Sequence, residues 1–348
     1  MGAEMATGSA RSGGSPRRKG TPASGPGPFF PTRPSELPRR AGQGLTHVLD
    51  RIAPMDEGSL DLLAPYVDIV KIGWGLPLLL PRETLRRRIA LFQHLGWKVS
   101  TGGTLLELAM VRGERDRALD EAKALGFDLI EVSEGVIDLT PEQVESAVAA
   151  ARSRGFEVLI EVGKKDPQHQ YSLRETLERV AHARRLRPLK VILESRESGR
   201  GVGIYDPDGA IKWEWVHALV ASHPPEDLLF EAPLESQQLG LLVDLGSEVN
   251  LGNVSFDSVA PLASQRLGLR GDTFGLSRRH RAVSGSPAAK FVYYLLENHR
   301  ELDQGDLVRL SRLPRRTVQS SLEELKRQGH VQETVSFTDA RRREYRLT

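Results

Sequence analysis

The feature that most constrains the fold is a regular alternation of short apolar runs with amphipathic helical stretches, which begins at Thr46. Eight apolar runs, among them DIVKIGWG and EVLIEVGKK, are separated by helical patterns such as PRETLRRRIALFQHLG and TPEQVESAVAAARSRG. Several of the helical stretches open with Ser, Thr or Pro and close with Gly, as helix termini do. Eight strand–helix units match the count and length of a (β/α)₈ barrel. We therefore predict an α/β protein with a TIM barrel over residues 46–280.

Each apolar run carries one polar residue near its expected C-terminal end. Side chains alternate between the two faces of a strand, and the active sites of TIM barrels lie at the C-terminal ends of the strands. The neighbours of these polar residues are mostly apolar or small, as expected for positions that face the helices. We predict that the polar residues point inward at the rim of the barrel. They are Asp50, Lys71, Ser100, Glu131, Glu161, Glu194, Glu231 and Asn250.

The four glutamates of this set raise an electrostatic problem. A buried carboxylate is costly unless it is compensated, and several carboxylates close together cannot all stay ionised without a cation. Lys71 supplies one positive charge, and oxygen ligands without cysteine or paired histidines favour Mg²⁺ or Mn²⁺ over zinc. Alternatively, the glutamates form ion pairs with nearby lysines or Arg196 and hold no metal. The predicted metal ligands are Glu131, Glu161, Glu194 and Glu231.

Two further segments at the same rim could bind anions. STGGT, from Ser100 to Thr104, joins a strand to a helix, so the backbone of Ser100, Thr101, Gly102 and Gly103 could hold a phosphate or carboxylate. An ordinary tight turn is the alternative. The loop from Glu194 to Asp206 contains Arg196 and Arg200 and is longer than a simple turn, and long loops on this face usually act on substrate. Its alternating glycines do not open directly into a helix, so we do not expect a dinucleotide site.

Composition excludes several classes of protein. The chain has no cysteine, which excludes disulfides and thiolate catalysis and is typical of a reducing compartment. No apolar run is long enough to span a membrane, and the N-terminus lacks the apolar core of a signal peptide. HExxH and GxSxG motifs are also absent from the sequence, which argues against zinc and serine hydrolases. We expect a soluble, cytoplasmic protein with no membrane partner.

Seven motifs, in order across about residues 45–275, resemble the phosphosulfolactate synthase family. They are VKIGWG, STGGTLLE, EVSEG, EVGKKDP, ESRESGRGVGIYD, FEAP and NLGNV. The resemblance implies an Mg²⁺-dependent lyase that adds sulfite to phosphoenolpyruvate, giving phosphosulfolactate for coenzyme M biosynthesis. It also implies that the TIM barrel is a subunit of a homo-oligomer.

The resemblance also implies roles for individual residues. Lys164, at the lysine position of the EVGKK motif, would be the general acid, with Lys165 as the alternative. Strand parity favours Lys165 instead, and a single bulge would reconcile the two. We count Lys71 as a third catalytic residue because it places a positive charge among the carboxylates. The substrate-binding candidates are Ser100, Thr101, Gly102, Gly103, Arg196, Arg200, Asn250 and Arg270.

The two ends of the chain differ in charge from its middle. Residues 1–45 carry seven Lys/Arg against two Asp/Glu, residues 285–348 carry twelve against nine, and the middle has a net charge of −6. The first segment is rich in Gly, Pro, Ser and Arg and poor in periodic apolar residues, so we predict a disordered tail over residues 1–45. Its basic RRK run could contact nucleic acid or could simply be solvated.

The segment 285–348 resembles a winged helix-turn-helix domain of MarR-like regulators. Its pattern is a helix, a short helix, a turn, a longer helix and two strands, which is a small α+β domain. The resemblance implies DNA contacts near the start of the longer helix and a basic wing; dimerisation is the alternative role. The whole chain could then be a DNA-binding transcriptional regulator that uses the TIM barrel as a ligand sensor. The DNA-binding candidates are Arg315, Arg316, Thr317, Gln319, Arg341 and Arg342.

Overall fold

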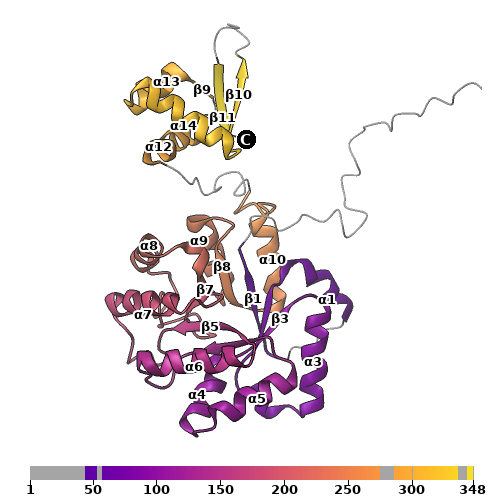
Figure 1. The fold of residues 1–348 in the computed structure, drawn as a ribbon. Helices are drawn as coiled ribbons and strands as arrows, with labels where there is room; N and C mark the ends of the chain where they lie inside the picture. The colour runs from indigo at the N-terminus through magenta and orange to yellow at the C-terminus, as the bar shows by residue number, and fades with distance from the viewer. Residues whose placement is uncertain (1–43, 53–56, 275–285, 300, 336–342, 348) are drawn as a thin grey trace, which may run out of the picture. The chain divides into compact units, whose positions relative to one another are not determined.

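The computed structural model describes residues 44–52, 57–274, 286–299, 301–335 and 343–347. Eight parallel strands close into a barrel in chain order, β1 to β8, with helices on the outside (Figure 1). The predicted (β/α)₈ TIM barrel is therefore confirmed. Almost all of the predicted disordered tail, residues 1–43, lies outside the described residues.

The strands are short and the helices are capped where the sequence predicts helix starts. Thr140 and Gln143 form a capping box at the start of α6, and Ser172 and Glu175 form one at the start of α7. The strands are β1 (Thr46–Asp50), β2 (Ile69–Ile72), β3 (Lys98–Thr101), β4 (Leu129–Val132), β5 (Glu157–Val162), β6 (Val191–Leu193), β7 (Leu228–Glu231) and β8 (Asn250–Val254). The helices are α1 (Glu57–Leu63), α2 (Leu76–Leu79), α3 (Arg82–His94), α4 (Gly103–Val111), α5 (Arg115–Leu125), α6 (Pro141–Ser153), α7 (Leu173–Arg185), α8 (Trp213–Ser222), α9 (Glu235–Leu245) and α10 (Phe256–Arg266).

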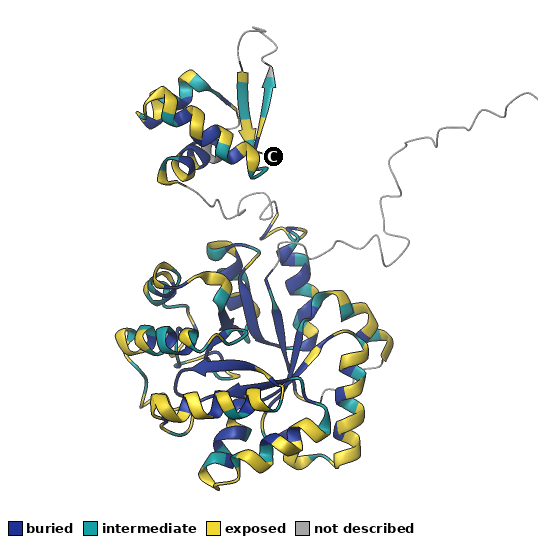
Figure 2. Ribbon diagram, in the orientation of Figure 1, coloured by how far each residue is buried: buried dark blue, intermediate teal, exposed yellow. Residues whose placement is uncertain are grey.

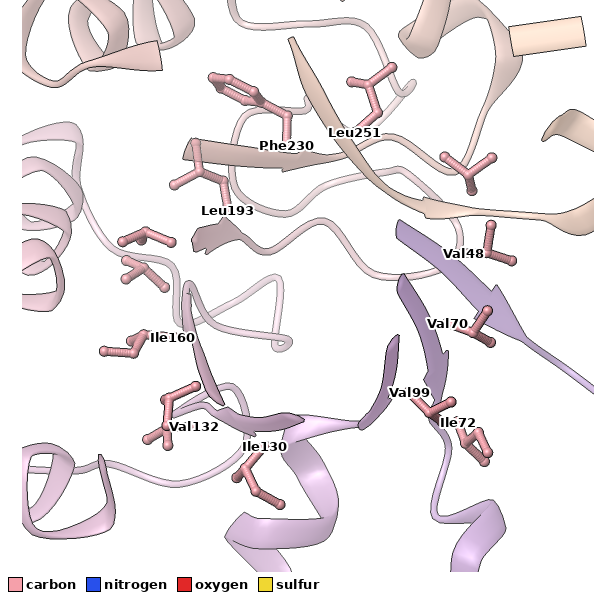
Figure 3. Packing of buried hydrophobic residues seen from close by; sticks show 14 of the residues in the cluster. Val48, Val70, Ile72, Val99, Ile130, Val132, Ile160, Leu193, Phe230 and Leu251 are labelled. Carbon is pink, nitrogen blue, oxygen red and sulfur yellow. The ribbon is translucent and has the colours of Figure 1, made fainter. Parts of the chain in front are cut away.

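The main hydrophobic core lies between the barrel and its ring of helices. Outward-facing strand residues such as Val70, Ile130 and Leu193 belong to it (Figure 3). Apart from Lys98 and Glu157, which begin β3 and β5, the barrel strands are buried, and the outer faces of the helices are exposed (Figure 2). This burial on both faces explains why the strands of the sequence read as nearly continuous apolar runs.

Inside the barrel, the same strands carry two layers of a different kind. The lower layer, which we call the barrel floor, consists of five apolar residues that are at most 1% exposed: Ile69, Leu129, Leu159, Ile192 and Leu229. Two residues further along the same strands lie the members of what we call the polar layer. They are Lys71, Glu131, Glu161, Glu194 and Glu231. The floor therefore seals the polar layer from the N-terminal end of the barrel.

Two of the eight residues predicted to line the rim lie elsewhere. Asp50 is buried, but Arg88 of α3 binds its carboxylate, with an Nη2–Oδ1 distance of 2.6 Å, so Asp50 faces the helices. Asn250 is the first residue of β8, and its side chain bonds the Leu45 amide at 2.9 Å and the Leu228 carbonyl at 2.7 Å near the barrel floor. The prediction for Asn250 was wrong because β8 continues four residues past it.

The C-terminal segment has its own hydrophobic core. Val292, Leu307, Val318 and Leu322 pack within it. Its elements are α12 (Pro287–Asn298), β9 (Leu302–Asp303), α13 (Gln304–Ser311), α14 (Arg315–Arg327), β10 (Val331–Val335) and β11 (Arg343–Leu347), with an antiparallel sheet in the order β10-β11-β9. The winged-helix assignment stays a prediction. Within the described residues, no helix is both long and apolar enough to cross a membrane.

Candidate active site

Lys71 lies at the centre of the polar layer. Its Nζ donates a hydrogen bond to Glu231 Oε1 at 2.9 Å and lies 3.2 Å from Glu131 Oε2 and 3.7 Å from Glu161 Oε2. The Lys71 side chain is only 7% exposed. Burial alone would lower the pKa of Lys71, but the three carboxylates overcome this effect and raise the pKa well above its ordinary value. Lys71 is therefore a fixed positive charge.

Lys165 supplies a second positive charge to the same cluster. Its Nζ donates to Glu194 Oε2 at 2.7 Å and to Glu161 Oε1 at 3.1 Å. Burial would lower the pKa of Lys165, but the carboxylates of Glu161 and Glu194 raise it above its ordinary value. The inward and outward alternation of β5 thus continues through Gly163 to Lys165, as strand parity predicts.

Glu131 is held by two neighbours on its own side of the barrel. Ser100 Oγ donates to Glu131 Oε1 at 3.0 Å, and His47 Nε2 lies 3.3 Å from the same oxygen. Burial would raise the pKa of Glu131, but Lys71 and His47 lower it below its ordinary value. His47 occupies the inward position on β1 that we predicted for Asp50. Sequence reasoning missed it, although it lies within the same five-residue run.

The pKa values of the other three carboxylates are shifted in different directions. Burial would raise the pKa of Glu161, but Lys165 and Lys71 lower it. Burial raises the pKa of Glu194 well above its ordinary value, and the charges of Glu161 and Glu231 raise it further. Burial likewise raises the pKa of Glu231, even though Lys71 acts against this rise. The two lysines thus do not fully compensate the cluster.

A divalent cation with oxygen ligands fits this uncompensated charge. Four carboxylates face two ammonium groups, so these six groups have a formal deficit of two positive charges. Glu161, Glu194 and Glu231 each offer an oxygen, and these oxygens all lie within 4.8 Å of one another. The buried Glu161 Oε2 has no hydrogen-bond partner among the described residues. Hard divalent cations such as Mg²⁺ prefer carboxylate oxygens.

Lys164 is directed away from the polar layer. Its Nζ donates to the carbonyls of Glu134 and Ile137, both at 2.7 Å, and lies 2.7 Å from Asp138 Oδ1. A lysine ammonium has three N–H groups, and these three partners occupy them. All three N–H groups of Lys164 are therefore occupied, and none is free for the general-acid role that the family resemblance implies.

The STGGT segment forms the predicted strand-to-helix junction. β3 ends at Thr101, Gly102 is the N-cap residue, and α4 begins at Gly103. Added at Gly103, a Cβ would lie 2.2 Å from Ser133 Oγ, so the close approach of the next strand end requires glycine here. The Thr101 hydroxyl is buried and has no hydrogen-bond partner among the described residues. A polar ligand could satisfy this hydroxyl.

Glu107 of α4 organises the neighbouring loop, and sequence reasoning missed it. Its buried carboxylate accepts hydrogen bonds from the Ser133 hydroxyl and from the amides of Gly135, Val136 and Ile137. The loop after β4 is thereby fixed beside the polar layer. The available signal was an acidic residue at the end of the otherwise apolar stretch TLLE.

The three arginines predicted to bind substrate lie in different environments. Arg196 is half-buried directly after Glu194, and its backbone amide donates to Glu194 Oε1 at 2.7 Å. Arg200 is exposed in the same loop. Arg270 forms surface ion pairs with Glu235 and, at 3.0 Å, with Asp272. Only Arg196 therefore adjoins the polar layer.

The predicted DNA-binding residues that the structure describes lie at the start of α14. Arg315, Arg316 and Gln319 are exposed, and Thr317 is half-buried. Arg341 and Arg342 lie outside the described residues. The N-terminal turns of α14 thus present basic and amide side chains to solvent.

Comparison with known proteins gives matches that cover the barrel. The family described as (2R)-phospho-3-sulfolactate synthase (ComA) matches residues 33–272. The phosphosulfolactate synthase of Methanocaldococcus jannaschii is 38% identical over 237 residues, which cover 67% of this chain and 94% of that relative. The phosphosulfolactate synthase of Methanothermobacter thermautotrophicus is 36% identical over 247 residues, or 68% and 95% of the two chains. That of Bacillus subtilis is 33% identical over 244 residues, or 69% and 94%.

Proposed function

Because this chain belongs to the (2R)-phospho-3-sulfolactate synthase family, and is an enzyme of that type, we propose that it adds sulfite to phosphoenolpyruvate with the help of Mg²⁺. The product would be phosphosulfolactate. The observation that carries this proposal is the buried polar layer, whose four carboxylates outnumber the ammonium groups of Lys71 and of the adjoining Lys165. A fold alone would not support a reaction, because TIM barrels host many unrelated activities.

The proposed metal ligands are Glu161, Glu194 and Glu231, with Glu131 as a fourth candidate held by Ser100 and His47. Bound Mg²⁺ would supply positive charge that stabilises the negative charge developing on the substrate when sulfite attacks. Two observations support this assignment: the uncompensated charge of the cluster, and the Glu161 oxygen that accepts no hydrogen bond from the described residues. The cluster would then be neutral instead of carrying a buried net charge.

The remaining steps fall to residues of the chain. The sulfur lone pair of sulfite forms the new bond to the terminal vinyl carbon of phosphoenolpyruvate. The electron pair of the double bond moves to the carbon that bears the carboxylate and phosphate, and that carbon then takes a proton. We assign the proton donor to Lys165, because its ammonium contacts Glu161 and Glu194 of the polar layer while that of Lys164 is directed at the loop after β4.

Substrate anions need binding groups around the opening at the C-terminal ends of the strands, which we call the barrel mouth. The Thr101 hydroxyl and the start of α4 are suited to an anionic oxygen, because helix N-termini present free N–H groups. Arg196, next to Glu194, is the arginine that could bind phosphate or sulfite with the least movement. Lys71 would hold the carboxylates in place throughout the reaction.

The decisive experiment incubates the full chain with phosphoenolpyruvate and sulfite and follows phosphosulfolactate by mass spectrometry. We expect product with Mg²⁺ and none with excess EDTA, and the activity should return when Mg²⁺ is restored. Glu161→Gln should abolish the response to Mg²⁺, whereas Glu157→Gln, at the exposed start of the same strand, should retain it. Absence of product under every metal condition would contradict the proposal.

A second proposal concerns the C-terminal segment, which extends beyond the family match. We propose that it is a winged helix that binds duplex DNA, and the exposed Arg315, Arg316 and Gln319 at the start of α14 favour this role. Binding by the full chain should weaken steeply with salt, and Arg315→Ala/Arg316→Ala should reduce the salt slope by about 2. Lys290→Ala on α12 is the matched control. If the full chain binds no DNA, or binds it with an affinity that does not depend on salt, dimerisation would be favoured as the role of the C-terminal segment.

The resemblance also leads us to propose that the barrel is a subunit of a homo-oligomer. Sedimentation of the full chain at several concentrations tests this directly. Sedimentation as a single chain at all concentrations would contradict it.

A further inference from the structure

A hydrogen bond crosses the mouth of the barrel. Trp74 follows β2, and Glu197 lies in the loop between β6 and α8. The indole Nε1 of Trp74 donates to Glu197 Oε1 at 2.6 Å. Strands β2 and β6 are separated by three strands in either direction around the closed barrel, so they stand opposite each other. The two side chains must therefore reach across the opening above the polar layer to meet.

A third strand end takes part in the same contact. Arg51 follows β1, and its guanidinium carbon lies 5.3 Å from the centre of the Trp74 ring, which is the arrangement of a cation–π interaction. Three non-glycine residues of these segments have left-handed backbone angles: Ile52 with φ 57°, Trp74 with φ 55° and Arg196 with φ 57°. Such angles persist only where the surroundings enforce them, and they occur often at clamps and switches.

The polar layer beneath this contact is closed to substrate. Its four glutamates are at most 2% exposed. Two cavities border Glu161 and Glu194, but both also have Val162 and residues of α7 in their walls, so they lie between the strands and the helices and not at the mouth. Access to the glutamates therefore requires part of the mouth to move.

The segment free to move is short, because the rest of the β6–α8 loop is anchored. Gln237 donates to the carbonyls of Gly199 and Gly209, and the Tyr205 hydroxyl donates to the carbonyl of Glu231. Between the anchored Gly199 and strand β6 lie the residues around Glu197. Trp74 is itself 50% exposed, so the bond that closes the mouth is made at the solvent surface. A bond in that position can break without disturbing the core.

We propose that Trp74 and Glu197 form a latch across the barrel mouth that must open before substrate reaches the polar layer. The identity of that substrate rests on the function proposed above, but the latch does not. In the closed state the indole N–H holds the Glu197 carboxylate above the opening, and Arg51 packs on the Trp74 ring. A carboxylate there repels an anionic substrate, so opening removes both a physical and an electrostatic barrier. Trp74 and Glu197 are thus positioning residues that control access.

The test measures opening directly, in the full chain without substrate, by hydrogen–deuterium exchange. The amides of Ser195 and Arg196 are informative because they donate to Glu231 and Glu194 beneath the latch. Trp74→Phe keeps an aromatic ring for Arg51 but removes the N–H donor, and Glu197→Ala removes the acceptor. Each variant should speed exchange of these amides by roughly fivefold, the effect of losing one exposed hydrogen bond. Amides of the β5 core should not change.

Three further variants make the result specific. Glu197→Gln keeps an oxygen acceptor and should exchange almost like the native chain. The double variant Trp74→Phe/Glu197→Ala should exchange no faster than either single variant, because both remove the same bond. Asp208→Ala removes an exposed carboxylate from the same loop and should leave exchange unchanged. Unchanged exchange in the single variants, equal exchange in Glu197→Gln and Glu197→Ala, or additive effects in the double variant would each overturn the latch.

A kinetic measurement then connects the latch to substrate. If opening limits entry, the observed rate of phosphoenolpyruvate binding levels off at high concentration, and Trp74→Phe should raise that plateau by roughly fivefold. A plateau that Trp74→Phe leaves unchanged would contradict control of access. A chain that makes no phosphosulfolactate but shows the exchange pattern above would retain the latch and lose only the proposed reaction.

Discussion

The barrel floor and the polar layer come from the same five strands and lie two residues apart, yet they solve opposite problems. Every member of the floor is apolar and buried, so each removes surface from water and stabilises the fold. Every member of the polar layer is ionisable and also buried, so each carries a desolvation penalty that its neighbours must offset. On each of these strands, one inward-facing residue therefore stabilises the fold, and the next inward-facing residue destabilises it.

This difference separates stability from activity along each strand. Apolar residues of the same volume would be better for folding at the polar layer, and the raised pKa of Glu194 and of Glu231 shows that their charges are only partly compensated. Retention of such a cluster is understandable if it binds a ligand. Changes in the polar layer should therefore alter function, and changes in the floor should alter stability.

The largest effect should come from the proposed proton donor. Lys165→Ala should lower kcat for phosphosulfolactate formation by about 10²- to 10⁴-fold, the usual contribution of general acid catalysis. Lys164→Ala is the matched neighbour, since its ammonium holds the carbonyls of Glu134 and Ile137. It should lower kcat much less and act mainly on stability. The reverse ranking, measured as single-turnover rates, would restore Lys164 to the role that the family resemblance implies.

A pair of variants on β6 should then separate the two layers by stability. Ile192→Ala removes a fully buried floor residue and should lower the free energy of unfolding by about 2–5 kcal/mol. Glu194→Gln should leave the metal-free protein as stable at pH 7 or slightly more stable. The folded-state pKa of Glu194 is raised, so its charge weakens the fold above pH 4.5 and the neutral amide removes that effect. Urea denaturation without divalent cations measures both, and a loss of several kcal/mol in Glu194→Gln would break the comparison.

The sequence predicted the polar layer better than it predicted individual positions at its edges. Alternation along the strands correctly placed the glutamates of β4, β5 and β7 inward, because each lies in a strand whose apolar neighbours fix its parity. The five-residue run THVLD contains both His47 and Asp50, which face opposite sides, and nothing within the run says which is inward. Asn250 faces inward but lies at the N-terminal end of its strand, whereas we predicted the C-terminal end. Sequence periodicity indicates which face of the strand a residue lies on, but not how far along the strand it lies.

The limits of strand periodicity also explain which contacts of the lysines and of the latch the sequence could predict. Parity correctly placed the Lys165 side chain inward, since β5 keeps its alternation for three residues after the strand ends. Most partners of Lys164 and Glu107 are backbone groups of the loop after β4, and backbone groups leave no pattern in a sequence. Trp74 and Glu197 are 123 positions apart, and only closure of the barrel brings them together.

Metal binding should stabilise the protein through the polar layer alone. At Mg²⁺ concentrations about 100-fold above the dissociation constant, the free energy of unfolding should rise by about 2.7 kcal/mol. Glu161→Gln should lose most of this gain, whereas Glu157→Gln on the same strand should keep it, because Glu157 pairs with Lys98 at the surface. Thermal unfolding with and without EDTA provides the measurement. Equal stabilisation of both variants would place the cation elsewhere.

The smallest effect tests whether the floor is purely structural. Ile69→Val deletes one methyl group from a residue that is 1% exposed and lies two positions before Lys71. Its free energy of unfolding should fall by about 0.5–1.5 kcal/mol, because the small cavity relaxes only in part. The kcat and KM values should not change, since Lys71 is held by three carboxylates and not by the residue below it. A fall in kcat that exceeds this loss of stability would mean that floor packing sets the height of the Lys71 ammonium, and the two layers would then act as one unit.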